Sequence, residues 1–305
     1  MLPLIAFWNG LERAARRRRL LVLYWFFHTL FALAVALPAA AVALPPLLHS
    51  RLAEELMKQF DLAWLAELYA SGGREAAPSV LAAAAWAAVV VWLGAIFLAG
   101  GAVPLLADPD GADSPARFWQ NAGRNFWRFF RLSLYFLVLY AAVYASLGLI
   151  RTAARALWGD GLAAAPLVYA DWLRLALLIL AFGLLSTAAA LARVRLVLAD
   201  SRHSLRACLG SVRLALRNLG VVFWLWACFA AAGLAAAWLY LRAAARLEPA
   251  PALLPLLVLL QQAYVFVQIC LRLAMWGAAA ELDPLLRPLP AAEPPAPAAA
   301  PEYEI

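Results

Sequence analysis

Apolar residues form six long runs along the chain, and shorter polar or basic segments separate them. Each run is at least as long as the roughly 18 consecutive apolar residues that are typical of a transmembrane helix. The runs occupy residues 20–48, 80–106, 132–150, 172–197, 219–241 and 253–280. The sequence therefore predicts an all-α, polytopic membrane protein with about six transmembrane helices.

The segment 201–218 has a different, amphipathic pattern that predicts a juxtamembrane helix. Its arginines fall on one face of the helix, and such a helix is expected to lie in the headgroup layer with its apolar side in the membrane. The alternative is that the arginines only set the topology and the leucines pack on neighbouring helices. The apolar positions recur at spacings of three, four and seven: Leu205, Cys208, Leu209, Val212, Leu216 and Leu219.

Residues 113–131 predict a second amphipathic helix of the same kind. Ser114 is a suitable N-cap and Pro115 suits the first turn. Phe and Trp side chains lie opposite the arginines, and aromatic side chains are typical of the membrane interface. The candidate lipid-headgroup contacts of the two helices are Arg117, Arg124, Arg128, Arg202, Arg206, Arg213 and Arg217.

The amphipathic segments recur at regular places and predict a threefold hairpin repeat, in which each unit is a surface helix followed by two spans. Residues 7–25 align without gaps on residues 118–136, and Arg217 and Asn218 match Arg124 and Asn125. A biased composition also produces such matches, which is the alternative explanation. The shared positions are Phe7/Phe118, Trp8/Trp119, Arg13/Arg124, Leu21/Leu132, Leu23/Leu134 and Tyr24/Tyr135.

The distribution of positive charge predicts the topology. Sixteen Lys and Arg residues fall on the side of the spans that carries both termini, and seven fall on the opposite side. By the positive-inside rule, both termini are expected in the cytoplasm. The chain is rich in Ala, Arg and Pro and has a single lysine, which is typical of a GC-rich bacterial genome, so we expect a bacterial inner-membrane protein.

The composition excludes a soluble protein. Hydrophobic residues make up 66% of the chain and charged residues 14%, against about 45–50% and 25% in soluble domains. The arginines that give the chain its formal charge of +7 border the apolar runs, so they indicate membrane topology and not nucleic-acid binding. Residues 1–280 are expected to form the membrane domain and residues 281–305 a disordered, Pro/Ala-rich cytoplasmic tail. Residues 49–79 predict a short helix on the outer leaflet.

The chain contains no motif of a common enzyme class: GxSxG, Walker, HExxH and intramembrane GxGD signatures are absent. Its three Cys and three His lack the spacing of metal ligands. The segment 108–117 approaches the DGxxAR signature of CDP-alcohol phosphatidyltransferases, but four residues separate its DG from its AR where that family has two. We therefore expect no enzyme activity, no cofactor and no metal.

Polar residues inside the apolar runs are the remaining candidates for a site, because an arginine at mid-membrane costs about 2.5–3.5 kcal/mol. Gln261, Gln268 and Arg272 share one face of the last run, and His28 follows Tyr24 by one turn in the first. If the two faces met, His28, Gln261, Gln268 and Arg272 would line a polar cavity for a solute or a lipid headgroup. The alternative is that Arg272 reaches the cytoplasmic surface and the glutamines bond between helices.

The run Ala207, Ser211, Leu214 and Asn218 in the basic helix resembles a pattern in bacterial polytopic membrane families of unknown function. Those families are similar to the membrane domain fused to some glycerophosphodiester phosphodiesterases. The resemblance covers about residues 80–280 and implies an architecture of six helices with juxtamembrane amphipathic helices. It implies no functional residue, because the chain has no catalytic phosphodiesterase domain.

Two functions follow from these observations. The first is a non-enzymatic membrane scaffold, or a partner- or lipid-binding module, that uses its amphipathic helices. The second is a small transporter or lipid-handling permease with a polar cavity in the membrane, and an enzyme acting on lipids comes third. The expected partners are membrane lipids first and another membrane protein second.

Overall fold

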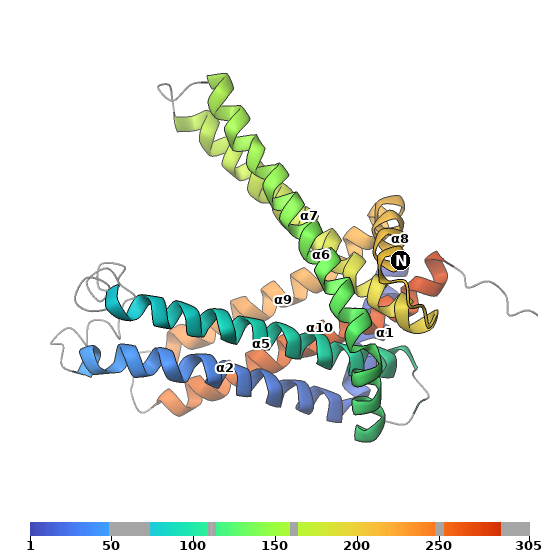
Figure 1. Cartoon of the computed structure of the whole chain (residues 1–305), viewed down its shortest axis with the longest axis horizontal. Coiled ribbons are helices and arrows are strands. Elements are labelled where there is room, and N and C mark those ends of the chain that lie inside the picture. Colours follow the sequence, from blue (N-terminus) through green and yellow to red (C-terminus); the bar gives the residue numbers. More distant parts are fainter. Residues whose placement is uncertain (49–73, 109–110, 112–113, 159–163, 248–252, 288–305) are drawn as a thin grey trace, which may run out of the picture.

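The computed structural model describes residues 1–48, 74–108, 111, 114–158, 164–247 and 253–287, and regular structure in these ranges is entirely helical. Figure 1 shows the arrangement of the helices. They are α1 (Leu2–Arg16), α2 (Arg18–Leu48), α5 (Arg74–Ala107), α6 (Pro115–Trp158), α7 (Ala164–Leu198), α8 (Ser204–Arg217), α9 (Leu219–Leu247) and α10 (Leu254–Leu286).

Five of these helices are long and apolar enough to cross a membrane, so the chain is a multi-pass membrane protein. The candidate spans are Ala84–Ala107, Pro115–Leu157, Val168–Leu198, Leu219–Leu247 and Pro255–Leu286. The sixth expected span coincides with α2, but the side chains of residues 35 and 38–48 lie outside the described part of the chain. A count of six stays a prediction, and so does the outer helix, since residues 49–73 also lie outside that part of the chain.

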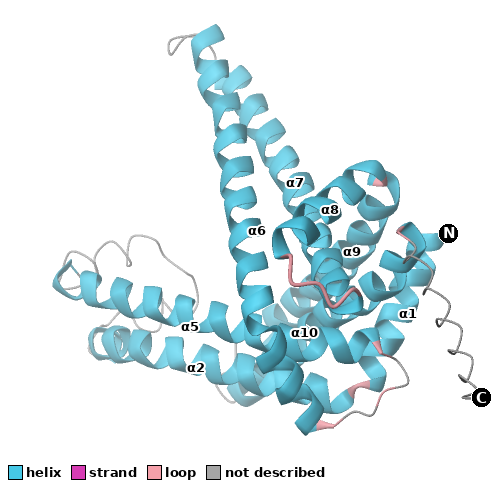
Figure 2. Cartoon of the chain, turned by 45° about the vertical axis from the view of Figure 1, so that its right-hand side comes forward, coloured by secondary structure: helices cyan, strands magenta, loops and turns pink. Residues whose placement is uncertain are grey.

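The helices form three pairs that diverge from a common end, which we call the base. The base consists of α1, α8, the first part of α6 and the last turns of α5, α7 and α10. Helix α2 contacts α5, α6 contacts α7, and α9 contacts α10. Figures 1 and 2 show the α6–α7 pair pointing away from the α2–α5 pair. The apolar walls between the pairs therefore separate with distance from the base.

Each basic helix at the base packs against the second helix of a neighbouring pair. Helix α1 contacts α10, the first part of α6 contacts α5, and α8 contacts α7. Small residues allow close approach: a Cβ added to Gly277 would lie 3.2 Å from the Gly10 carbonyl oxygen, and one added to Gly100 would lie 3.1 Å from that of Ala122. Glycine and alanine residues therefore allow the basic helices to pack closely on the spans at the base.

Two helix boundaries differ from the expected ones. Residues 115–158 form one continuous helix, where we expected a surface helix to end near residue 131, because no strong helix breaker separates the two parts. At 1.5 Å per residue, its 44 residues extend about 66 Å, more than twice the thickness of the hydrocarbon layer. Helix α10 continues to Leu286, so residues 281–286, expected in the tail, are helical; Leu282 and Asp283 are fully buried.

Candidate functional site

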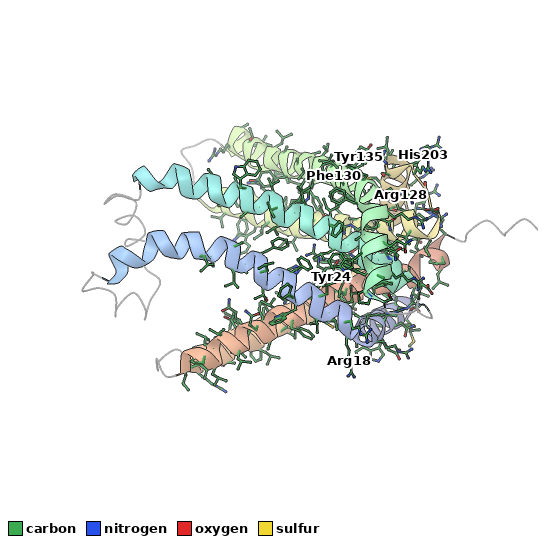
Figure 3. The ribbon with its side chains drawn as sticks, turned by 60° about the horizontal axis from the view of Figure 1, so that its bottom comes forward. Arg18, Tyr24, Arg128, Phe130, Tyr135 and His203 are labelled. Carbon is green, nitrogen blue, oxygen red and sulfur yellow. The ribbon has the colours of Figure 1, made fainter. Side chains whose placement is uncertain are left out.

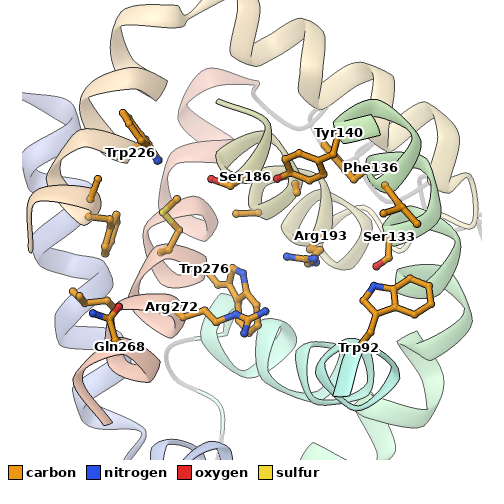
Figure 4. A pocket seen from close by; sticks show the side chains of 17 residues that line it. Trp92, Ser133, Phe136, Tyr140, Ser186, Arg193, Trp226, Gln268, Arg272 and Trp276 are labelled. Carbon is orange, nitrogen blue, oxygen red and sulfur yellow. The ribbon is translucent and has the colours of Figure 1, made fainter. Parts of the chain in front are cut away.

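A cavity of about 630 Å³ lies where the α6–α7 pair separates from α9 and α10. Such a volume is typical of a small-molecule or lipid-headgroup site. Figure 4 shows the side chains that line it, among them Arg193 of α7 with Gln268, Arg272 and Trp276 of α10. The remaining wall is mainly apolar and comes from α6, α7, α9 and α10, with one residue, Trp92, from α5.

The two arginines of the cavity lack a carboxylate partner. Among the described residues, neither guanidinium group makes a hydrogen bond or an ion pair. Both lie near the Trp276 ring, at 5.8 Å for Arg193 and 5.7 Å for Arg272. A cation beside an aromatic face gains about 0.5–2 kcal/mol. This contact uses no N–H group, so the N–H donors of both guanidinium groups have no acceptor among the described residues. The two charges also repel each other, so the cavity favours an anion.

Neutral polar groups surround the two guanidinium groups. Gln268 donates to the Gly233 carbonyl oxygen of α9 at 3.4 Å, and its own side-chain oxygen accepts no hydrogen bond within the described part of the chain. Ser186 donates to the Gly183 carbonyl oxygen of its own helix at 2.8 Å. Ser133 and Tyr140 add two further hydroxyl groups. Hydroxyl and amide groups of this kind are suited to orienting a polar headgroup.

The structure brings together two of the four residues that the sequence suggested for a polar cavity. Gln268 and Arg272 line the cavity. His28 does not line it and bonds through Nδ1 to the Tyr24 carbonyl oxygen at 2.8 Å in its own helix. Gln261 also lies outside the lining and is exposed. The predicted polar cavity thus contains half of the expected residues.

Helices α2 and α10 face one another, but Gln262 makes the contact in place of its neighbour. The Gln262 side-chain oxygen accepts from Trp25 Nε1 at 3.0 Å and from the Thr29 hydroxyl at 3.3 Å. Nearer the base, the Tyr24 ring lies edge-on to Trp276, with 6.1 Å between ring centroids. Gln262, which we did not single out from the sequence, therefore has the interhelical role that we gave as the alternative explanation for Gln261 and Gln268.

Arg193 is the charged residue of the cavity that we did not expect from the sequence. It lies five residues before the end of α7, so it was counted with the topology arginines that follow the span. A signal was present in its spacing: Ser186, Ala189, Ala190 and Arg193 share one helical face and all line the cavity. A small-residue face that ends in an arginine indicates a charge that points between helices.

At the base, three arginines of α6 pair with carboxylates, in contrast to those of the cavity. Arg117 lies 2.6 Å from Asp108, and Asp200 accepts from Arg128 at 2.6 Å and from Arg124 at 2.7 Å. The Arg117 guanidinium lowers the pKa of Asp108, and Arg128 together with Arg124 lowers the pKa of Asp200. Three of the seven expected headgroup contacts therefore hold neighbouring helix ends together. Figure 3 shows Arg128 at this end of the bundle.

Two further contacts at the base involve α10. The fully buried Asp283 lies 3.4 Å from Arg195 of α7, and Glu281 accepts from Asn9 at 2.6 Å and from Arg13 at 3.4 Å. Both carboxylates belong to the stretch that the sequence placed in the tail. Both lie in α10.

The other four expected headgroup contacts, Arg202, Arg206, Arg213 and Arg217, are exposed along and beside α8. Within the described residues their side chains make no hydrogen bond or ion pair. They are available to a partner outside the chain.

Compared with family models, curated proteins and solved structures, the chain has no match. The function is therefore argued from the geometry of its own residues.

Proposed function

We propose that the protein binds an anionic phospholipid from the leaflet at its base, with the lipid phosphate between Arg193 and Arg272. The observation that carries the proposal is that two arginines without a carboxylate partner line one cavity of the membrane domain. Guanidinium groups form charge-assisted hydrogen bonds with phosphate oxygens, and such bonds are among the strong ones. This is the lipid-handling function that the sequence offered as the alternative to a scaffold.

The depth of the two arginines supports a lipid headgroup as the ligand. Arg193 lies five residues and Arg272 fourteen residues before the base ends of their helices, which corresponds to about 8 Å and 21 Å along the axes. A phosphate held there is drawn only part of the way into the membrane from the headgroup layer. The free energy that two unpaired charges cost at this depth is offset when the anion binds.

The apolar side of the cavity supports a ligand with acyl chains. Phe136, Phe229, Leu271 and Met275 form this side. Leu137 also lines the cavity and is 56% exposed, so the cavity opens sideways along α6. A phospholipid that enters there keeps its chains among the surrounding lipids while its phosphate reaches the arginines.

The proposal includes the predicted number of spans, the position of the termini and the identity of the membrane. The protein has six spans with both termini in the cytoplasm of a bacterium, and the base lies at the inner leaflet of the inner membrane. It has no catalytic role, and the resemblance to the membrane domains of some phosphodiesterases concerns the architecture.

The test is a lipid titration of the purified full-length protein in detergent. Trp92, Trp226 and Trp276 line the cavity, so tryptophan fluorescence reports the binding of short-chain phosphatidylglycerol. The double variant Arg193→Gln/Arg272→Gln is expected to raise the Kd about 100-fold or more, because each lost charge-assisted bond is worth about 1.5–3 kcal/mol.

The matched control is Arg242→Gln/Arg246→Gln, which removes two exposed arginines from the far end of α9. It removes the same charge and is expected to leave the Kd unchanged. Equal affinity of the cavity variant and the wild type would refute the proposal. If inorganic phosphate binds as tightly as the lipid and displaces it, the ligand is a soluble anion and the site belongs to a transporter.

A further inference from the structure

Helix α8 presents three faces of different chemistry. The face toward the protein carries small or medium-sized residues: Ser204, Ala207, Cys208, Ser211, Leu214 and Ala215 are buried. About a third of a turn further round, Leu205, Leu209 and Leu216 are 49%, 57% and 60% exposed. Each leucine therefore keeps about half or more of its surface uncovered in the described structure, whereas Cys208 and Val212 of the same apolar pattern pack in or against the core.

The third face of α8 is basic and adjoins the leucines. Arg206, Arg213 and Arg217 lie a further third of a turn or less round the helix and are exposed. The leucine face and the basic face thus meet along one edge of the helix. We call these two faces together the α8 edge.

The same order of faces recurs on α1. Ala6, Gly10 and Ala14 are buried against the protein. The exposed Leu4 and Trp8 follow in the same rotational direction. The next face carries the Glu12–Arg16 ion pair together with the exposed Ile5. On both α1 and α8, the exposed apolar side therefore lies next to the buried side in the same direction of rotation about the helix axis.

The first part of α6 has this order as well. Phe118, Ala122 and Asn125 are buried, Trp119 follows with 43% of its surface exposed, and Arg124 follows Trp119. Three helices that pack on three different spans thus present buried, apolar and charged faces in one rotational order, and the charged face is basic on α6 and α8. A common flat boundary between an apolar and an aqueous phase is the environment that satisfies all three.

We infer that the α8 edge docks into the headgroup layer of the leaflet at the base, with its leucines among acyl chains and its arginines on phosphates of anionic lipids. Charge complementarity supports a lipid surface, because the three arginines of the edge make no ion pair in the described part of the chain. Exposed leucines beside exposed arginines are the pattern of a helix that lies in the membrane interface. This surface is separate from the cavity and does not depend on the lipid proposed there.

The test is cysteine labelling of the full-length protein in vesicles of phosphatidylcholine and phosphatidylglycerol. Two variants form a matched pair on α8: Leu216→Cys on the leucine face and Arg213→Cys on the basic face. A water-soluble maleimide is admitted to both sides of the vesicles, and labelling is read peptide by peptide in a mass spectrometer. Burial raises the pKa of the native Cys208 thiol, which therefore reacts slowly.

The expected result is at least tenfold slower labelling at Leu216→Cys than at Arg213→Cys in vesicles, with similar rates once the protein is in denaturant. Equal rates in vesicles would overturn the inference, because the leucine face would then lie in water. Protection in native membranes that is absent in vesicles of purified protein would overturn it too, since a protein partner would then cover the edge.

A second measurement tests the arginines. Spin-labelled phosphatidylglycerol and phosphatidylcholine report the preference of the protein for anionic lipid over neutral lipid. Replacing Arg206, Arg213 and Arg217 by Gln in the Arg193→Gln/Arg272→Gln background is expected to lower this preference at least twofold. An unchanged preference would show that the edge does not bind lipid phosphate.

Discussion

The cavity and the base both contain arginines, but only the arginines of the base are paired with carboxylates. At the base, Arg117, Arg128 and Arg195 each lie within 3.4 Å of a carboxylate. In the cavity, Arg193 and Arg272 have the Trp276 ring beside them and no carboxylate among the described residues. Arg193 and Arg195 are two residues apart on one helix, so position along the membrane does not explain the difference. The difference teaches that paired charges join helices, whereas unpaired charges are available to a ligand.

The largest expected effect follows from removing one partner of the buried pair at the base. Arg195→Met removes the ion-pair partner of the fully buried Asp283 and leaves only the charge of Arg287 near it, and losing one partner of a buried ion pair costs about 3 kcal/mol or more. The free energy of unfolding, measured by SDS titration in mixed micelles at neutral pH, is expected to fall by about this amount. Unchanged stability would remove the distinction between base and cavity.

A smaller effect is expected for Arg193, the neighbouring arginine of the cavity: its replacement changes stability little or increases it. Arg193→Met removes a charge that has no carboxylate partner and that repels Arg272, at the expense of a cation–π contact worth about 0.5–2 kcal/mol. In the same titration, the free energy of unfolding is expected to stay within about 1 kcal/mol of the wild type or to rise. A loss as large as that of Arg195→Met would show that Arg193 joins helices and is not held for a ligand.

The smallest effect concerns the exposed ion pairs of the base, and it disappears in acid. Arg128 and Arg124 lower the pKa of Asp200 from its usual 3.8. A carboxyl whose pKa is lower in the folded state adds stability above its unfolded pKa, and this is lost as the pH falls through the folded value. Asp200→Asn is therefore expected to lower the thermal midpoint slightly at pH 6 and not at all near pH 2. A difference that persists at pH 2 would show that charge is not the cause.

Some of the site could be predicted from the sequence, because burying an arginine or a glutamine in an apolar run is costly and such residues stand out. Gln268 and Arg272 were found in this way. Gln261 and Gln262 are adjacent, however, and sequence spacing does not say which of the two faces α2. That choice depends on the rotation of α10 against its neighbours, which is set by contacts such as those of Gly10 with Ala274 and Ala278.

The pairing of charges was also not predictable. Asp200 follows α7, while its partners Arg124 and Arg128 precede it by more than seventy residues. The sequence therefore offered no reason to separate these arginines from the exposed ones of α8. Only the packing of α6 on α5 and α7 brings the three groups together.

By itself, the sequence determined that the chain is helical and crosses the membrane several times, because long apolar runs have no other stable solution in lipid. It also determined the amphipathic pattern of α8, since helical periodicity is a local property. The tertiary structure decided which arginines meet carboxylates, which arginines line the cavity and which leucines remain exposed. The physical reason is that these outcomes depend on the rotation and spacing of helices far apart in the chain, and small-residue contacts fix that rotation.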